Sequence, residues 1–80
     1  MKIIPTSENL ADLASGESAT IIAIQTDDAL RQRLMALGFR VGKRIELIRK
    51  ARFSGPLQVR IGTTDIVLRQ REALQIAVQK

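Results

Sequence analysis

The sequence contains no cysteine and no histidine, and its only aromatic residues are Phe39 and Phe53. Without cysteine there are no disulfide bonds and no thiolate chemistry. Without histidine the chain lacks the most frequent general base and metal ligand, and every Ser–His or Cys–His nucleophilic scheme is excluded. The eight acidic residues do not cluster. We therefore expect no enzyme, no resident metal and no cofactor.

Long apolar runs are also missing. The longest uninterrupted one, residues 21–24, is far shorter than the roughly 20 residues of a membrane-spanning helix. Residues 1–5 are followed at once by polar residues, a pattern unlike a signal peptide. We expect a cytoplasmic protein, and a length of 80 residues predicts one domain covering residues 1–80.

What the sequence does contain is basic charge, with 13 Lys and Arg against 8 Asp and Glu and a net charge of +5. Such an excess favours an acidic partner, although a solvated basic surface accounts for it equally well. Small single-strand binders place stacking aromatics between their cations. Only Phe39 and Phe53 are available, and we expect Phe39 in the core. Nucleic-acid binding is therefore the less favoured alternative.

Apolar patterning predicts a mainly β domain of five strands and two helices. The predicted strands cover residues 17–25, 44–50, 57–61, 66–69 and 74–78. Alternation in the third is clean, with Leu57, Val59 and Ile61 facing inward and Gln58 and Arg60 outward. A turn at residues 70–73 precedes the last strand. Strands this short protect their edges best by closing, which predicts a small barrel.

The two predicted helices differ in strength. A short N-terminal helix is expected around Leu10 and Leu13, capped by Thr6 or Ser7 and closed by Gly16. The better one is inserted at residues 29–37, after the cap Asp27–Asp28 and before Gly38. Its apolar residues at i, i+4 and i+7 predict one core-facing stripe of Leu30, Leu34 and Leu37.

Four segments resemble, in order and over nearly the whole chain, the sequence pattern of one known family. They are residues 10–24 (LADLASGESATIIAI), 33–45 (RLMALGFRVGKRI), 51–59 (ARFSGPLQV) and 66–78, which contains IVLRQREA and IAV. The family is FeoA, a small cytosolic component of bacterial ferrous iron uptake. The chain departs from the pattern at Val41 and Arg52, where the family usually has proline in turns.

The resemblance implies an SH3-like barrel against which the inserted helix packs. It implies a non-enzymatic protein that binds and modulates FeoB, the membrane ferrous iron transporter. The cytosolic part of FeoB is a GTPase, and binding to it would recruit the domain to the membrane. The same module occurs in iron-dependent repressors of the DtxR type, so an interaction domain in iron-dependent regulation is the alternative. The short chain favours the transport role.

SH3-like barrels bind through loops and an adjacent groove, where exposed apolar side chains are surrounded by charge. We therefore predict partner binding by Arg31 and Met35 on the inserted helix and by Arg52 and Phe53 in the loop after residue 50. The alternative for Phe53 is that it folds back over a barrel end. The chain has neither the histidines nor the grouped carboxylates of a tight Fe²⁺ site. Apolar residues 21–24 leave weak self-association open.

Overall fold

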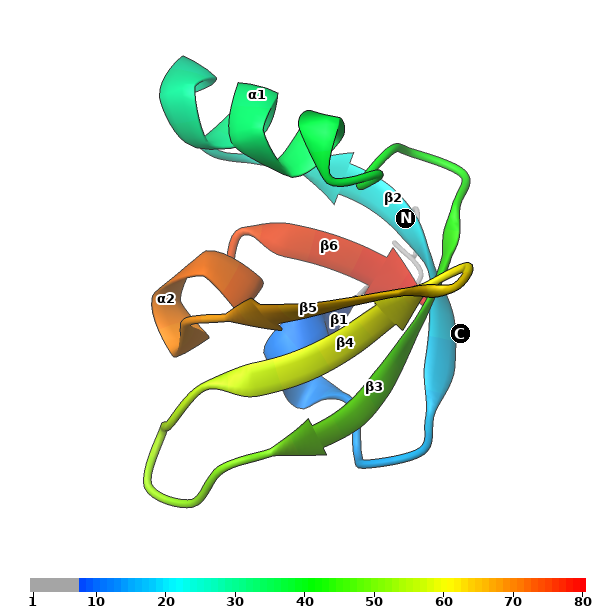
Figure 1. Cartoon of the computed structure of the whole chain (residues 1–80), viewed down its shortest axis with the longest axis vertical. Helices are drawn as coiled ribbons and strands as arrows, with labels where there is room; N and C mark the ends of the chain where they lie inside the picture. The colour runs from blue at the N-terminus through cyan, green and yellow to red at the C-terminus, as the bar shows by residue number, and fades with distance from the viewer. Residues whose placement is uncertain (1–7) are drawn as a thin grey trace, which may run out of the picture.

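A computed structural model describes residues 8–80, which form six strands, two α-helices and one 3-10 turn. In chain order these are β1 (Glu8–Asn9), η1 (Leu10–Asp12), β2 (Ser18–Ile24), α1 (Asp28–Ala36), β3 (Arg44–Lys50), β4 (Leu57–Ile61), β5 (Thr64–Leu68), α2 (Gln70–Ala73) and β6 (Ile76–Gln79). All strands belong to one antiparallel sheet with the order β1-β6-β2-β3-β4-β5 (Figure 1). The predicted mainly β fold is confirmed.

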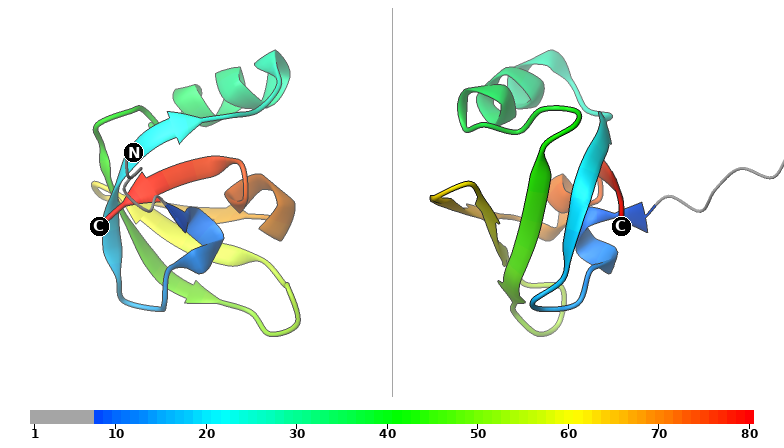
Figure 2. Two further views of the ribbon diagram at one scale, coloured as in Figure 1. Left: turned by 180° about the vertical axis from the view of Figure 1, so that it is seen from behind. Right: turned by 90° about the vertical axis from the view of Figure 1, so that its right-hand side faces the viewer.

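The sheet is strongly curled, which gives the molecule the form of a half-open barrel (Figure 2). Two strand pairs are irregular: the register shifts between Ile21 and Ala23 where β2 meets β6, and between Leu47 and Arg49 where β3 meets β4. A bulge of this kind increases the local twist. The barrel remains open because β1 and β5 are the two outer strands of the sheet.

Alternation along the strands places one face of the sheet in a single aliphatic core. Strand β4 follows its prediction, because Leu57, Val59 and Ile61 are buried whereas Gln58 and Arg60 are turned toward the outside. Among the described residues no buried side chain of the core is polar or charged. The fold is therefore stabilised mainly by burial of aliphatic surface, at roughly 25 cal/mol per Å².

The N-terminal segment corrects the prediction of a short helix there. Glu8 pairs opposite Val78 of β6, so the chain begins the described region as a strand, followed by the single 3-10 turn η1. That turn is capped by Asn9, whose side chain accepts the N–H of Ala11 at 2.9 Å. The predicted caps, Thr6 and Ser7, lie outside the described residues.

The physical reason for this difference is the sheet itself. Pairing with β6 uses the backbone groups that the first turn of a helix would need. Leu10 and Leu13 are nevertheless fully buried. Their spacing therefore indicated correctly that this segment faces the core. The segment forms one 3-10 turn rather than a helix.

Helix α1 forms where it was predicted and begins at its predicted cap. Asp27 accepts the N–H of Leu30 at 2.8 Å, which satisfies one of the free donors at the helix start. Leu34 is the only fully buried residue of α1, and Leu30 is partly buried against the same core. The helix is thus anchored to the barrel by a narrow apolar contact.

The end of α1 corrects the predicted stripe. Leu37 is 40% exposed and is the C-cap residue rather than a core residue. The chain turns at Gly38, whose φ of +104° favours glycine, and this turn brings the N–H of Phe39 to the carbonyl of Leu34 at 3.0 Å. Phe39 is fully buried, as predicted, so at this end of α1 it is Phe39 and not Leu37 that belongs to the core.

Residues 70–73 form a one-turn helix, α2, where only a turn was predicted. The sheet has six strands rather than about five, because β1 was not predicted as a strand. Glu72 stabilises the start of α2 by accepting the N–H of Arg69 at 3.0 Å. No helix within residues 8–80 has the length and apolar character needed to span a bilayer.

Candidate partner-binding cleft

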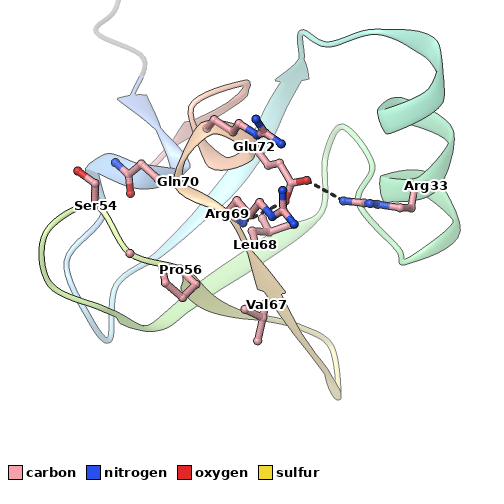
Figure 3. A pocket seen from close by; sticks show the side chains of 10 residues that line it. Arg33, Ser54, Pro56, Val67, Leu68, Arg69, Gln70 and Glu72 are labelled. Carbon is pink, nitrogen blue, oxygen red and sulfur yellow. Dashed lines mark hydrogen bonds and ion pairs between the residues drawn. The ribbon is translucent and has the colours of Figure 1, made fainter.

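An open cleft of about 860 Å³ crosses the carboxyl end of β5. Arg33 of α1 lies at one end of it, and residues 54–56 of the β3–β4 loop lie at the other (Figure 3). The segment 67–72, from the end of β5 into α2, forms the surface between them. The cleft thus collects residues from three separate parts of the chain.

The middle of the cleft is apolar and accessible. Val67 is 67% exposed and Pro56 is exposed beside it, whereas Leu68 points into the core. Exposed aliphatic side chains surrounded by charged ones are typical of protein-interaction surfaces. A partner that covers Val67 and Pro56 would gain hydrophobic stabilisation without any change in the fold.

One ion pair connects α1 to α2 across this cleft. The Arg33 guanidinium lies 2.7 Å from the Glu72 carboxylate, and the side chain of Glu72 is only 13% exposed. The backbone N–H of Arg69 and, after it, the Arg33 guanidinium hold the pKa of Glu72 below its usual range. Glu72 is therefore ionised at neutral pH and serves to orient Arg33.

The remaining charge of the cleft is positive. Arg69 and Arg71 are exposed, and Glu72 is the only carboxylate among the lining residues. Since Glu72 is already bonded to Arg33 and to a backbone N–H, the cleft keeps an excess of cationic hydrogen-bond donors. This surface complements an acidic ligand.

The predicted residues of α1 lie outside this cleft. Met35 is 45% exposed, and Arg31 is partly buried, with its guanidinium 3.3 Å from the carbonyl oxygen of Thr26. Each lies two positions from Arg33, and a helix turns by about 100° per residue, so both point to the far side of α1. Arg31 and Met35 therefore share a face with each other but not with Arg33.

The predicted residues of the loop lie at its tip. The N–H of Gly55 bonds to the carbonyl of Arg52 at 3.1 Å, and Phe53 and Ser54 between them have φ of +58° and +62°. This is a type I′ turn, which normally requires glycine or asparagine at its central positions. Phe53 is 96% exposed, so it does not fold back over the barrel end.

Helix α1 and the β3–β4 loop, which were predicted to form the two edges of a groove, lie at the two ends of one cleft and line it with side chains other than those predicted. Helix α1 contributes Arg33 and the loop contributes Ser54, Gly55 and Pro56. The pairs Arg31–Met35 and Arg52–Phe53 lie near opposite ends of the long axis of the molecule, because α1 and the loop do (Figure 1). A partner-binding role for these four residues stays a prediction.

Sequence reasoning did not identify Arg33, Val67, Arg69 and Glu72 as members of the site. Arg33 and Glu72 are 39 positions apart, and nothing in their local sequence links them. One signal was available for Glu72: it stands three residues after the end of a strand, at the position where a carboxylate completes a helix start.

The described residues contain no group of three or more carboxylates that are close enough together to hold a metal ion. Several carboxylates instead form ion pairs, among them Asp65 with Arg60 at 2.6 Å and Glu17 with Lys80 at 3.0 Å. The Arg60 guanidinium holds the pKa of Asp65 below its usual value. The N–H of Ala14 and, after it, the Lys80 ammonium hold the pKa of Glu17 below its usual value.

The sequence pattern of the FeoA domain matches residues 8–80. The chain belongs to the FeoA family. This FeoA domain is 30% identical over 70 residues to an Fe(2+) transport protein A/Fe(2+) transporter FeoB fusion protein of Porphyromonas gingivalis. The match covers 88% of the chain but only 8% of that fusion protein, so the chain spans a small part of the relative's length.

Solved structures of other FeoA proteins have the same fold. FeoA of Stenotrophomonas maltophilia, complexed with zinc and described as a prokaryotic SH3 domain protein, is 32% identical with a TM-score of 0.78, covering 89% of this chain and 88% of that one. Iron(II) transport protein A of Clostridium thermocellum is 34% identical with a TM-score of 0.83, covering 89% of this chain and 44% of that one. The predicted SH3-like fold and FeoA family are confirmed.

A manganese-dependent transcriptional repressor has the same fold within a longer chain. Its TM-score is 0.87 at 20% identity, with 98% of this chain and 38% of the repressor aligned. At this identity the likeness concerns the fold alone.

Proposed function

We propose that this FeoA domain binds the ferrous iron transporter FeoB from the cytoplasmic side and modulates its activity without catalysing a reaction itself. The role is that of an accessory module of iron uptake. Its working surface is the cleft between α1 and the β3–β4 loop, together with the exposed tip of that loop.

The observation that carries the proposal is the fusion of a homologous domain to FeoB in one polypeptide. Joining two modules in one chain raises their effective concentration to about millimolar values, so even a weak contact between them is populated. A fusion also fixes their ratio. Both properties suit a module that works on the transporter.

The surface of this chain supports a protein partner rather than a small substrate. The cleft is open, and its exposed residues Val67 and Pro56 lie between cationic side chains. The side chain of Phe53 is almost fully exposed. An aromatic side chain presented in this way adds large contact area at little entropic cost. Nucleic acid would more typically meet several stacking aromatics.

The test is a pull-down of the chain by FeoB of the same organism, using the full-length transporter in detergent and its separate cytosolic part. An oligonucleotide column serves as the control. Retention by FeoB and not by the oligonucleotide supports the proposal, and the rate of GTP hydrolysis with and without the chain then gives the direction of modulation. Retention by the oligonucleotide alone would contradict it.

A further inference from the structure

We infer that the free edge of β5 accepts an extended acidic segment of the partner as an additional strand, which lies between β5 and α1. The inference deepens the proposed function, because it names the chemistry of the segment that this FeoA domain would bind. Addition of a strand to an exposed sheet edge is a common mode of peptide recognition, in which main-chain hydrogen bonds supply the affinity.

Strand β5 has unused backbone groups along its outer side. It pairs with β4 through a two-residue turn at Gly62 and Thr63, with Ile61 opposite Thr64. In such a hairpin the residues flanking the turn bond to each other and bonding then alternates. The N–H and C=O groups of Asp65 and Val67 therefore point away from β4, toward the open edge.

This edge carries none of the usual protection against strand addition. Between Thr64 and Leu68 there is no proline, no lysine and no register shift, and β-branched residues predominate. Asp65 is the only charged residue, and its carboxylate is turned toward β4, where it bonds to Arg60 at 2.6 Å. Within residues 8–80 the opposite edge of the sheet is the two-residue strand β1.

Open surface lies at both ends of β5, on the side where α1 lies. Clefts occur at both ends of the strand, and α1 or the turn that follows it contributes to each: Arg33 lines the one at the carboxyl end, and Leu37 and Gly38 line the other beside Thr64. Helix α1 and the β4–β5 hairpin lie on the same side of β3 (Figure 2). Arg33 and Leu37 are four positions apart, so they mark one face of α1 along this path.

The charge of these two clefts selects the occupant. Together they are lined by Arg33, Lys43, Arg44, Arg69 and Arg71, against the single carboxylate of Glu72. An extended segment carrying glutamate or aspartate complements this surface. A second copy of this chain would bring the same cations against each other, at a net charge of +5 per molecule.

Amide hydrogen exchange on the unmodified protein tests the inference directly. In the free chain the amides of Asp65 and Val67 should exchange faster than those of Ile66 and Leu68, which face β4. Adding the cytosolic part of FeoB, or a short synthetic peptide of alternating valine and glutamate, should slow Asp65 and Val67 by about 10-fold or more. A peptide of alternating valine and lysine is the charge control.

Two substitutions at one position give a matched test. Val67→Pro removes the outward N–H while leaving the bonds to β4 intact, and should weaken binding by about 10-fold. Val67→Ile keeps both the N–H and an apolar, β-branched side chain, and should weaken binding much less than Val67→Pro does. The inference would be overturned if the two substitutions weakened binding equally. It would also be overturned if FeoB bound without slowing amide exchange at Asp65 and Val67. Either result would leave the proposed function standing. Protection by the valine–glutamate peptide without any binding of FeoB would uphold the edge site and contradict the proposed function.

Discussion

Phe53 and Ser54 occupy a backbone region that residues with a side chain normally avoid. Their φ values of +58° and +62° form the centre of the type I′ turn at the tip of the β3–β4 loop. A left-handed conformation costs such residues about 1–2 kcal/mol each. The neighbouring Gly55 is required by close contact, since a Cβ there would lie 2.6 Å from the Cβ of Ala51. A strained turn that displays a fully exposed aromatic ring is consistent with a binding role.

A first prediction separates strain from binding. Phe53→Asn should raise the free energy of unfolding by about 0.5–1 kcal/mol, because asparagine tolerates the left-handed region better, and should weaken binding to FeoB. Ser54→Gly is the control, with a similar gain in stability and a smaller effect on binding, because it removes only a hydroxymethyl group at one end of the cleft. Urea unfolding and calorimetric titration measure the two effects. If Phe53→Asn left the affinity for FeoB unaltered, Phe53 would have no part in docking.

The residue types in the sequence predict which side chains are buried better than they predict which side chains form the cleft. The burial of Phe39 follows from its place after a helix end, whereas the sequence left open whether Phe53 is exposed or folds back over a barrel end. The ion pair of Arg33 with Glu72 depends on how α2 meets α1. Such a contact is set by tertiary packing, so no local pattern in the sequence predicts it.

Among the secondary-structure elements, α1 depends on its cap more than most helices do, since Leu34 is its only fully buried residue. Asp27→Ala should lower the free energy of unfolding by about 1 kcal/mol, because it removes the 2.8 Å bond to the N–H of Leu30. Asp28→Ala, one residue later, removes no such bond and should cost less. Thermal unfolding of both variants checks the difference. Equal losses would mean that Asp27 acts through charge alone.

Periodicity explains which elements the sequence predicts well. Strands β3 and β4 were predicted with their observed limits, because alternation over five or more residues defines a half-buried strand. The one-turn helix α2 and the two-residue strand β1 are too short to carry a period. Leu37 was placed in the core because the pattern of α1 was extended past the residue at which the helix ends.

For the whole molecule, three carboxylates make stability depend on acidity. The pKa values of Glu17, Asp65 and Glu72 lie below their ordinary values, which are 4.5 for the glutamates and 3.8 for the aspartate. A carboxylate whose pKa is lower in the folded chain stabilises the fold above the unfolded-state pKa. That contribution is lost as the pH falls through the folded-state pKa.

We therefore predict a free energy of unfolding that is nearly constant from about pH 7 to pH 5 and falls at lower pH. Glu72→Gln should reduce this fall, because it removes one of the titrating groups. Glu46→Gln, at a carboxylate outside the three ion pairs of Glu17, Asp65 and Glu72, serves as the control. Urea unfolding at a series of pH values measures both. A stability that is the same near pH 3 as at pH 6 would show that these pairs do not stabilise the fold.

The measurement that tests the central claim most directly is a nuclear magnetic resonance titration of the isotope-labelled chain with the cytosolic part of FeoB. The account predicts saturable shifts confined to the cleft and its surroundings, at Arg33, Phe53, Val67 and the segment 69–72. It predicts no comparable change with an oligonucleotide of equal charge. The account is contradicted if FeoB leaves these signals unmoved, or if the oligonucleotide alone shifts them.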